Sequence, residues 1–412
     1  MSQLTHADLI NLLLALSIIL FGGRLVGEVF RKIGQPSVIG EILAGVILGP
    51  TVLGMFFPEA FQMIFPSENN VALVLDGFTQ VSVILLLFIA GLEVELDVVM
   101  QQGKKASIIS FFSIIVPFAI GFGVPMLWPD LLEVEPENKF IFSLFFGTAL
   151  SITALPVIAR ILMDLNLFKT GFGVIIITSA MVNDLLGWMF FAVILTMITP
   201  SAGTNLWATL GTTIGFSLLM LTFGRFLFNK ILPWINTNFA WPGGILSISI
   251  ALCLLAASFT EFIGIHGIFG AFILGVALSS SFHFKDKAKE IIHHFVNNIF
   301  APIFFVGIGL RTDFIQNFDF KLTFLVIVIA FAGKLIGGSI GARLSGYNNR
   351  ESLAISSGMN ARGAMEIILG LLALQAQIIN EEMFVAIVVM ALFTSITSGP
   401  MMKYFIGNRK IS

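Results

Sequence analysis

Long apolar runs, separated by short polar loops, make up most of this chain. A helix needs about 20 mainly apolar residues to cross the hydrocarbon core of a bilayer. Runs of this kind predict an all-α polytopic membrane protein, one transmembrane domain over residues 1–412 with about thirteen crossings. The crossings are expected at 8–30, 37–54, 72–96, 105–127, 139–163, 171–198, 204–229, 242–260, 265–282, 293–311, 322–345, 351–377 and 382–405.

The odd number of crossings is compatible with an inverted repeat. Crossings 1–6 (residues 8–198) and 8–13 (residues 242–405) form two six-helix repeats if crossing 7 (residues 204–229) links them. Corresponding members then lie seven crossings apart and run in opposite directions, as in many secondary transporters. The short second and ninth crossings contain Gly45, Gly49, Gly270 and Gly275, which suit close helix contacts. No regulatory domain is expected after the last crossing.

Composition supports lipid as the solvent. The chain is 57% hydrophobic and 11% charged, whereas roughly a quarter of the residues of a soluble domain are charged. A formal net charge of -2 gives no support for nucleic-acid binding. The lone Cys253 excludes an internal disulfide and a multi-cysteine metal site. We find no phosphate-binding loop, no His/Cys metal spacing and no nucleophile–base pair, so neither enzyme activity nor a cofactor is expected.

Loop charges predict the orientation, because cytoplasmic loops are enriched in Lys and Arg. With the N-terminus outside and the C-terminus cytoplasmic, in a plasma or bacterial inner membrane, the cytoplasmic loops hold 16 of the 22 basic residues. These are Arg31, Lys32, Lys104, Lys105, Arg160, Lys169, Arg225, Lys230, Lys285, Lys287, Lys289, Arg343, Arg350, Lys403, Arg409 and Lys410. The outer loops hold Lys139, Arg311 and Lys321, and the crossings hold Arg24, Lys334 and Arg362.

The sixth crossing contains a carboxylate near its centre, in the sequence Val182-Asn183-Asp184. Charges at this depth are costly and usually functional. An ionised Asp184 must meet a cation, a basic partner or water, or else take up a proton. Asn183 adds a carbonyl acceptor without adding charge. One carboxylate that holds either a cation or a proton is the chemistry of an exchanger, and the structural alternative is a carboxylate fixed in a permanent ion pair.

The fifth crossing contains Ser151, Thr153 and Pro156. Proline lacks an amide proton and clashes with the carbonyl four residues earlier, here that of Ile152. Carbonyls freed in this way, together with the two hydroxyls, are hard oxygen ligands for an alkali cation. Irregular backbone at this depth requires surrounding protein or a water-filled cavity. A simple proline kink is the alternative.

The twelfth and eleventh crossings also contain charged residues. Gly358 and Gly363 weaken the twelfth helix around Arg362, and Glu366 lies four residues later, where helical spacing allows an ion pair. We interpret these two as a structural pair. Lys334, midway along the eleventh crossing, is too deep to reach the interface easily. It is expected either to exchange a proton or pair with Asp184, or else to neutralise carbonyls at the broken helices.

These motifs resemble the monovalent cation:proton antiporters of the second superfamily, which include bacterial sodium/proton antiporters, potassium efflux proteins and plant cation/proton exchangers. The segment 151–162 is similar to their first broken helix, 358–366 to their second, and Asn183-Asp184 to their ion-binding motif. The resemblance covers essentially the whole chain. It implies two crossed broken helices, a core domain that moves like an elevator, a dimerisation domain and a homodimer.

Two positions differ in what they imply about stoichiometry. Asn183 stands where electrogenic members have a second aspartate, and Lys334 falls where those members keep a lysine. Our hypothesis is alternating access to one site in the lipid bilayer, where Na+ or K+ competes with H+ for Asp184. Its ligands would be Asp184, Asn183, Thr153 and Ser151, with Lys334, Arg362 and Glu366 compensating charge or coupling the fluxes. A cation channel or uniporter without obligatory proton coupling is the alternative, and an organic-anion cotransporter is a third possibility.

Overall fold

The computed structural model describes residues 5–33, 35–66, 70–94, 96–134, 138–165, 167–168, 170–198, 206–281, 284 and 286–406. The regular structure of these residues is helical, and none of them lies in a strand. The all-α fold class is therefore confirmed. Four basic residues used to predict the orientation lie outside the described residues, namely Lys169, Lys285, Arg409 and Lys410.

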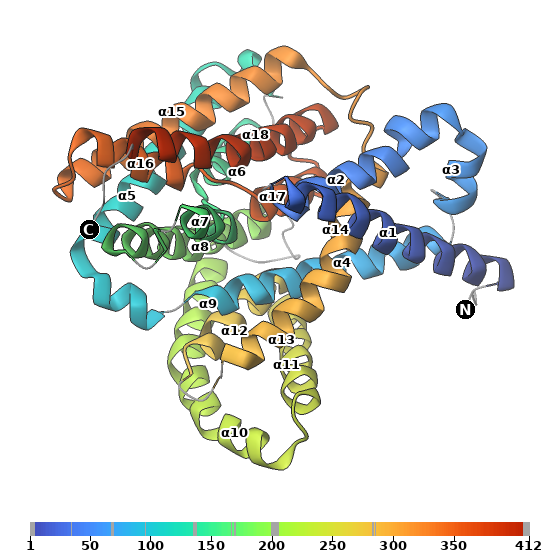
Figure 1. Ribbon diagram of the computed structural model, residues 1–412, viewed down its shortest axis with the longest axis horizontal. Coiled ribbons are helices and arrows are strands. Elements are labelled where there is room, and N and C mark those ends of the chain that lie inside the picture. Colours follow the sequence, from blue (N-terminus) through green and yellow to red (C-terminus); the bar gives the residue numbers. More distant parts are fainter. Residues whose placement is uncertain are drawn as a thin grey trace. The chain divides into compact units, whose positions relative to one another are not determined.

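Figure 1 shows the order of the helices along the chain. Those of the first half are α1 (His6–Lys32), α2 (Ser37–Leu48), α3 (Pro58–Ile64), α4 (Asn70–Glu93), α5 (Leu96–Leu127), α6 (Lys139–Ser151), α7 (Leu155–Asp164) and α8 (Gly171–Ile198). The middle of the chain forms α9 (Leu206–Leu219), α10 (Arg225–Asn238) and α11 (Gly243–Phe262). The remaining helices are α12 (Gly267–Ser279), α13 (Asp286–Phe295), α14 (Ala301–Arg311), α15 (Phe320–Leu344), α16 (Asn349–Met359), α17 (Ala364–Gln375) and α18 (Glu381–Ile406).

The hydropathy pattern located these helices well. Among the described residues, eleven helical segments are long and apolar enough to cross a membrane, and two shorter apolar helices span Gly267–Ser279 and Met365–Gln375. Each of the predicted crossings overlaps one of these segments. The two shorter helices account for the remaining two crossings. Helix α12 is the short ninth crossing, and the twelfth crossing is divided between α16 and α17.

The chain forms two compact units, each drawn from both sequence halves. Unit 1 comprises Met1–Leu92, Leu219–Glu261 and Gly270–Phe318, and unit 2 comprises Glu93–Leu218, Phe262–Phe269 and Asp319–Ser412. Unit 1 thus holds most of crossings 1–3 and 8–10, and unit 2 holds crossings 4–6 and 11–13. Crossing 7 and the start of crossing 9 are divided between the units. Unit 1 contains the first three members of each predicted repeat, and unit 2 contains the last three members of each.

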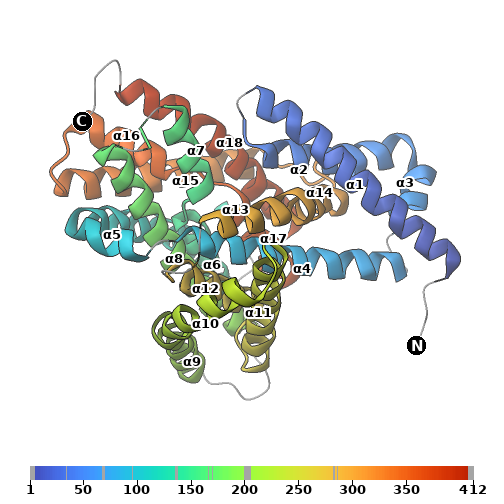
Figure 2. The same ribbon diagram turned by 60° about the horizontal axis from the view of Figure 1, so that its bottom comes forward.

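In unit 1, α1, α2 and α14 lie side by side (Figure 2). Glycines let their backbones approach closely. A Cβ atom added to Gly49 would lie 2.2 Å from the carbonyl oxygen of Gly309, and one added to Gly45 would lie 2.2 Å from that of Val306. Backbone atoms would also lie within 2.5 Å of a Cβ on Gly270 or Gly275. The close contacts predicted for the glycines of the two short crossings are confirmed.

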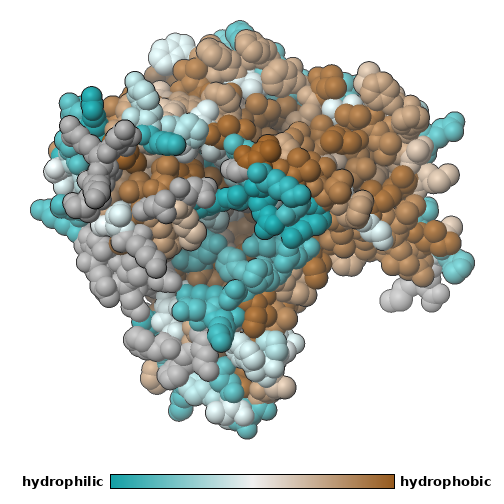
Figure 3. Space-filling view, in the orientation of Figure 1, coloured by the Kyte–Doolittle hydropathy of each residue, from teal (hydrophilic) through white to brown (hydrophobic). Residues whose placement is uncertain are grey.

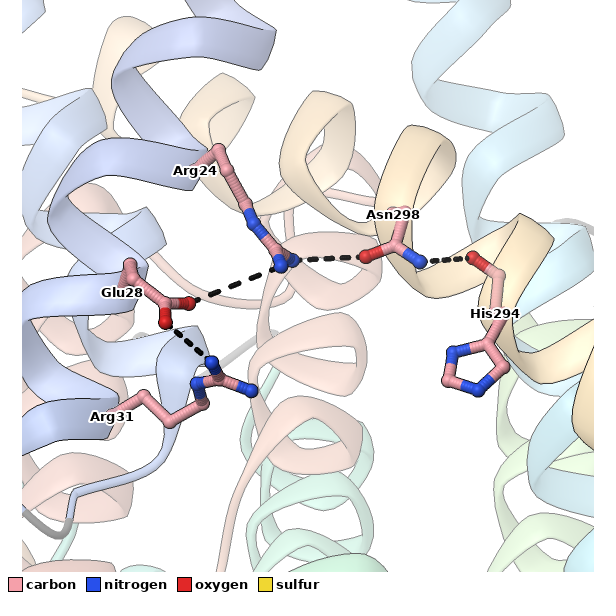
Figure 4. Close-up of polar contacts among 5 residues, drawn as sticks. All are labelled: Arg24, Glu28, Arg31, His294 and Asn298. Carbon is pink, nitrogen blue, oxygen red and sulfur yellow. Dashed lines mark hydrogen bonds and ion pairs between the residues drawn. The ribbon is translucent and has the colours of Figure 1, made fainter.

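The outward face of α1 is mainly apolar. Figure 3 shows hydrophobic side chains over the part of unit 1 that α1 and α3 form. Leu13, Phe21 and Leu25 of α1 are exposed. Towards its C-terminal end this face becomes polar. There Arg24 donates a hydrogen bond of 2.9 Å to Asn298, and Glu28 pairs with Arg31 (Figure 4).

In unit 2, α15 packs against α5, α16 and α18, and α5 packs against α6 and α8 (Figure 1). Polar residues define where two of these helices begin. The Asp319 carboxylate accepts from the Leu322 N–H at 2.6 Å at the start of α15, and Asn348 and Glu351 form a capping box at the start of α16. These starts set the register that places Lys334 and the end of α16 inside the unit.

Candidate functional site

The fifth crossing is broken rather than kinked. Helix α6 ends at Ser151, and α7 begins at Leu155 with Pro156 in its first turn. The connecting backbone is extended at Ile152 (φ -72°, ψ 153°) and Ala154 (φ -77°, ψ 104°). Proline is tolerated in the first turn because its missing N–H would have no intrahelical partner there. The break leaves the last carbonyls of α6 and the first N–H groups of α7 inside unit 2.

The twelfth crossing is broken in the same way. Helix α16 ends at Met359, and α17 begins at Ala364. Between them, Gly363 is extended (φ -176°, ψ -138°), and its N–H donates to the Glu366 Oε2 atom at 2.8 Å. Glu366 thereby caps the first turn of α17, where a carboxylate is also favoured by the helix dipole.

The two breaks cross and are bonded to each other. The N–H of Ala154 donates to the carbonyl oxygen of Ala361 at 2.9 Å. The Thr153 hydroxyl donates to the carbonyl oxygen of Met359 at 2.8 Å. One main-chain and one side-chain hydrogen bond thus join residues about 200 positions apart, and they fix the two non-helical segments against each other.

Two buried cations neutralise the C-terminal end of α6. The Arg362 guanidinium donates to the carbonyl oxygens of Ala149 (3.1 Å) and Leu150 (2.8 Å). The Lys334 ammonium donates to the carbonyl oxygen of Ser151. A helix C-terminus carries partial negative charge on its unsatisfied carbonyls, so cations are favoured there. Of the interpretations considered for Lys334, the geometry shows neutralisation of helix-end carbonyls, and no ion pair with Asp184 is present among the described residues.

Lys334 has two more partners. Its Nζ atom lies 2.7 Å from Thr153 Oγ1 and 3.1 Å from the carbonyl oxygen of Ser113 on α5. Ser113 is a site residue that the sequence analysis missed. Its hydroxyl also accepts from the Asn183 amide at 3.4 Å. Nothing in the sequence distinguishes this serine from the other hydroxyl residues of the apolar crossings.

Asp184 and Asn183 lie on α8 within the same cluster, 1% and 0% exposed. The Asn183 Nδ2 atom donates to Thr153 Oγ1 at 3.3 Å. The Oδ1 atom of the same amide has no partner among the described residues. Neither oxygen of Asp184 accepts a well-aligned hydrogen bond from the described residues. The Leu155 N–H, at the positive N-terminal end of α7, lies close enough to interact with this carboxylate electrostatically.

Glu366 and Lys334 also interact electrostatically with Asp184. Arg362 and Glu366, predicted to form a structural pair, interact electrostatically but make no direct ion pair among the described residues. Residues 360–363 are not helical, so the two side chains bond to different helix ends. All seven predicted site residues nevertheless lie in unit 2, at or beside the place where the two helix breaks meet.

Comparisons with known proteins agree with this arrangement. Residues 14–405 match the family model described as "Sodium/hydrogen exchanger, transmembrane". The Na(+)/H(+) antiporter NhaS4 of Synechocystis is 34% identical over 395 residues, which cover 95% of this chain and 96% of the relative. The probable Na(+)/H(+) antiporter GerT of Bacillus cereus is 30% identical and covered to 98%. The K(+)/H(+) antiporter 1 of Saccharomyces cerevisiae is 32% identical over 93% of this chain.

Coverage differs among these relatives. The chain spans nearly all of NhaS4 and GerT, but 45% of the yeast antiporter. The solved structure of the sodium proton antiporter MjNhaP1 from Methanocaldococcus jannaschii matches this chain with a TM-score of 0.69 at 18% identity, over 96% of each chain. That likeness establishes a shared fold.

Proposed function

Because the chain belongs to the sodium/hydrogen exchanger family, we propose that it is a membrane antiporter that exchanges a monovalent cation, Na+ or K+, for protons. The names of NhaS4 and GerT support Na+, and the name of the yeast relative supports K+. The relatives therefore leave both cations as candidates.

A single observation supports Asp184 as the shared binding group. It is a buried carboxylate, and neither of its oxygens accepts a well-aligned hydrogen bond from the described residues, although the Leu155 N–H, Lys334 and Arg362 lie in the same cluster. Burying an ionised carboxylate without partners is strongly unfavourable. Either a bound alkali cation or a bound proton removes that cost. Because both bind the same carboxylate, binding of one weakens binding of the other.

This competition couples the two fluxes. When the site faces one side, the cation binds Asp184 and Asn183 and displaces the proton to that side. When the site faces the other side, a proton binds the carboxylate and the cation leaves. The other polar residues hold the site together: Thr153 and Ser151 at the first break, Lys334 and Arg362 at the end of α6, and Glu366 at the start of α17.

We also propose the setting in which this exchange takes place. The protein would span a plasma or bacterial inner membrane with its N-terminus outside and its C-terminus in the cytoplasm, as the distribution of Lys and Arg predicts. Two copies would form a homodimer, and alternating access would occur in each copy separately. Crosslinking of the reconstituted protein tests the dimer, and labelling of single introduced cysteines from either side tests the orientation.

The test of the proposed function is reconstitution of purified protein in vesicles that contain a pH-sensitive dye. The wild type is expected to move protons only when Na+ or K+ is present on the opposite side. Asp184→Asn removes the titratable group with little change of shape, and we expect it to abolish this exchange in a protein that still folds and inserts. Cation-driven proton movement that persists in Asp184→Asn would contradict the proposal.

A matched control is Asp76→Asn. The Asp76 carboxylate lies on α4 in unit 1, is 43% exposed and pairs with Arg311 at 2.8 Å. Exchange is expected to continue in this variant. The same vesicles separate antiport from a channel or uniporter, because a channel conducts the cation with no matching proton movement.

A further inference from the structure

The second broken helix contains a buried amide that the proposed mechanism does not use. Asn360 is 1% exposed, and neither its Oδ1 nor its Nδ2 atom has a hydrogen-bond partner among the described residues. Buried polar side chains are nearly always paired, and an unpaired one costs free energy. Among the described residues, both polar atoms of the Asn360 amide are therefore available to a further group.

Its position relates this amide to the site. Met359, which precedes Asn360, accepts the hydrogen bond from the Thr153 hydroxyl, and Ala361, which follows it, accepts the hydrogen bond from the Ala154 N–H. Asn360 is thus the central residue of the segment that lies against the first break. Thr153 in turn contacts Asn183, the neighbour of Asp184.

Of the two hydroxyls predicted as ligands at the first break, that of Thr153 is fully engaged. A threonine hydroxyl has one donor and two acceptor lone pairs. Thr153 uses all three, because it donates to Met359 and accepts from Lys334 (2.7 Å) and Asn183 (3.3 Å). The Ser151 hydroxyl donates to Gly147 at 2.6 Å, and its carbonyl accepts from Lys334. Thr153 in particular has no lone pair left for a cation.

The unused acceptors lie elsewhere. Among the described residues of this cluster, the buried side-chain oxygens without a hydrogen bond are Asp184 Oδ1, Asp184 Oδ2, Asn183 Oδ1, Asn360 Oδ1 and Glu366 Oε1. Alkali cations, like other hard cations, prefer carboxylate and carbonyl oxygens of this kind. Three of these five atoms belong to α8 and the other two to the second broken helix.

We infer that the side-chain oxygen of Asn360 is a ligand of the transported cation, so that the second broken helix supplies a ligand that the Thr153 hydroxyl cannot. The inference rests on the proposed function and refines its ligand set. A neutral amide oxygen adds coordination without adding a second charge at that position. Its contribution therefore falls on cation affinity and on the choice among cations.

The test measures cation affinity and selectivity of reconstituted Asn360→Ala against wild type, with Li+, Na+, K+ and Rb+ at constant pH. Loss of one ligand to a charged group is expected to raise the KM of the preferred cation about tenfold and to change the order of selectivity. The maximal rate is expected to fall much less. In detergent, the rise of melting temperature on adding that cation is expected to shrink, because ligand binding stabilises the folded state by mass action.

Ser357→Ala is the matched control, because Ser357 is also buried on α16 and its hydroxyl is satisfied by the carbonyl of Leu353 at 2.7 Å. It is expected to keep the wild-type KM and selectivity. Asn360→Ser provides a second variant if Asn360→Ala does not fold, and an intermediate KM is expected. Wild-type KM, selectivity and thermal response in folded Asn360 variants would overturn the inference. A wild type without cation-dependent proton flux would instead refute the proposed function.

Discussion

The ammonium nitrogen of Lys334 lies 2.7 Å from the hydroxyl oxygen of Thr153, and the same ammonium group bonds to the carbonyls of Ser113 and Ser151. The lysine therefore joins α15 to α5 and to the first break. These contacts make its side chain part of the scaffold around Asp184. Its nitrogen is held by other acceptors and leaves the Asp184 oxygens to a cation.

Replacement of Lys334 by methionine is expected to destabilise the protein. It keeps a long apolar side chain but removes the donors to the carbonyls of Ser113 and Ser151 and to the Thr153 hydroxyl, and an unsatisfied buried acceptor costs at least about 1 kcal/mol. We expect a loss of about 2 kcal/mol or more, measured as a lower melting temperature in detergent. The control is Lys321→Met, an exposed position on the same helix. Equal melting temperatures for wild type and Lys334→Met would show that these bonds contribute no stability.

Competition at Asp184 predicts how exchange depends on pH. Protons and the cation bind the same carboxylate, so acidification should raise the apparent KM of the cation, by up to about tenfold for each pH unit once protonation dominates. The maximal rate at saturating cation should change less, because a high cation concentration displaces the proton. Initial rates at several external pH values and cation concentrations measure both quantities. An apparent KM that does not change with pH, in a range where the rate does, would argue against a shared site.

The glycine contact between α2 and α14 predicts opposite effects for two identical substitutions. Gly45→Ala would place a Cβ atom 2.2 Å from the carbonyl oxygen of Val306, so the two helices must move apart and thermal stability should fall. Gly77 lies inside α4, and a Cβ added there would meet no heavy atom within 4 Å beyond the adjacent backbone of its own helix. Alanine is better than glycine in a helix by about 0.5–1 kcal/mol, so Gly77→Ala should be slightly more stable. Similar melting temperatures for both variants would contradict the close contact.

Hydropathy was sufficient to predict the crossings and the all-α class because a bilayer requires long apolar helices and satisfied backbone groups. The crossed arrangement of the two broken helices was implied by the family resemblance. The break in the fifth crossing was also predictable, since Pro156 interferes with the helix before it, and Gly358 and Gly363 indicated the second break. The partners of the buried charges were not predictable. Lys334 and Ser113 are 221 positions apart. The direct hydrogen-bond partners of Arg362, the carbonyls of Ala149 and Leu150, are likewise more than 200 positions away in the sequence.

The hydrogen bond from the Ala154 N–H to the Ala361 carbonyl is formed by backbone atoms alone. Almost any amino acid at these two positions supplies the same donor and the same acceptor. Substitutions at these two positions can change the surrounding packing while the hydrogen bond is kept. Proline at position 154 is the exception, because it has no backbone N–H and cannot donate to the Ala361 carbonyl.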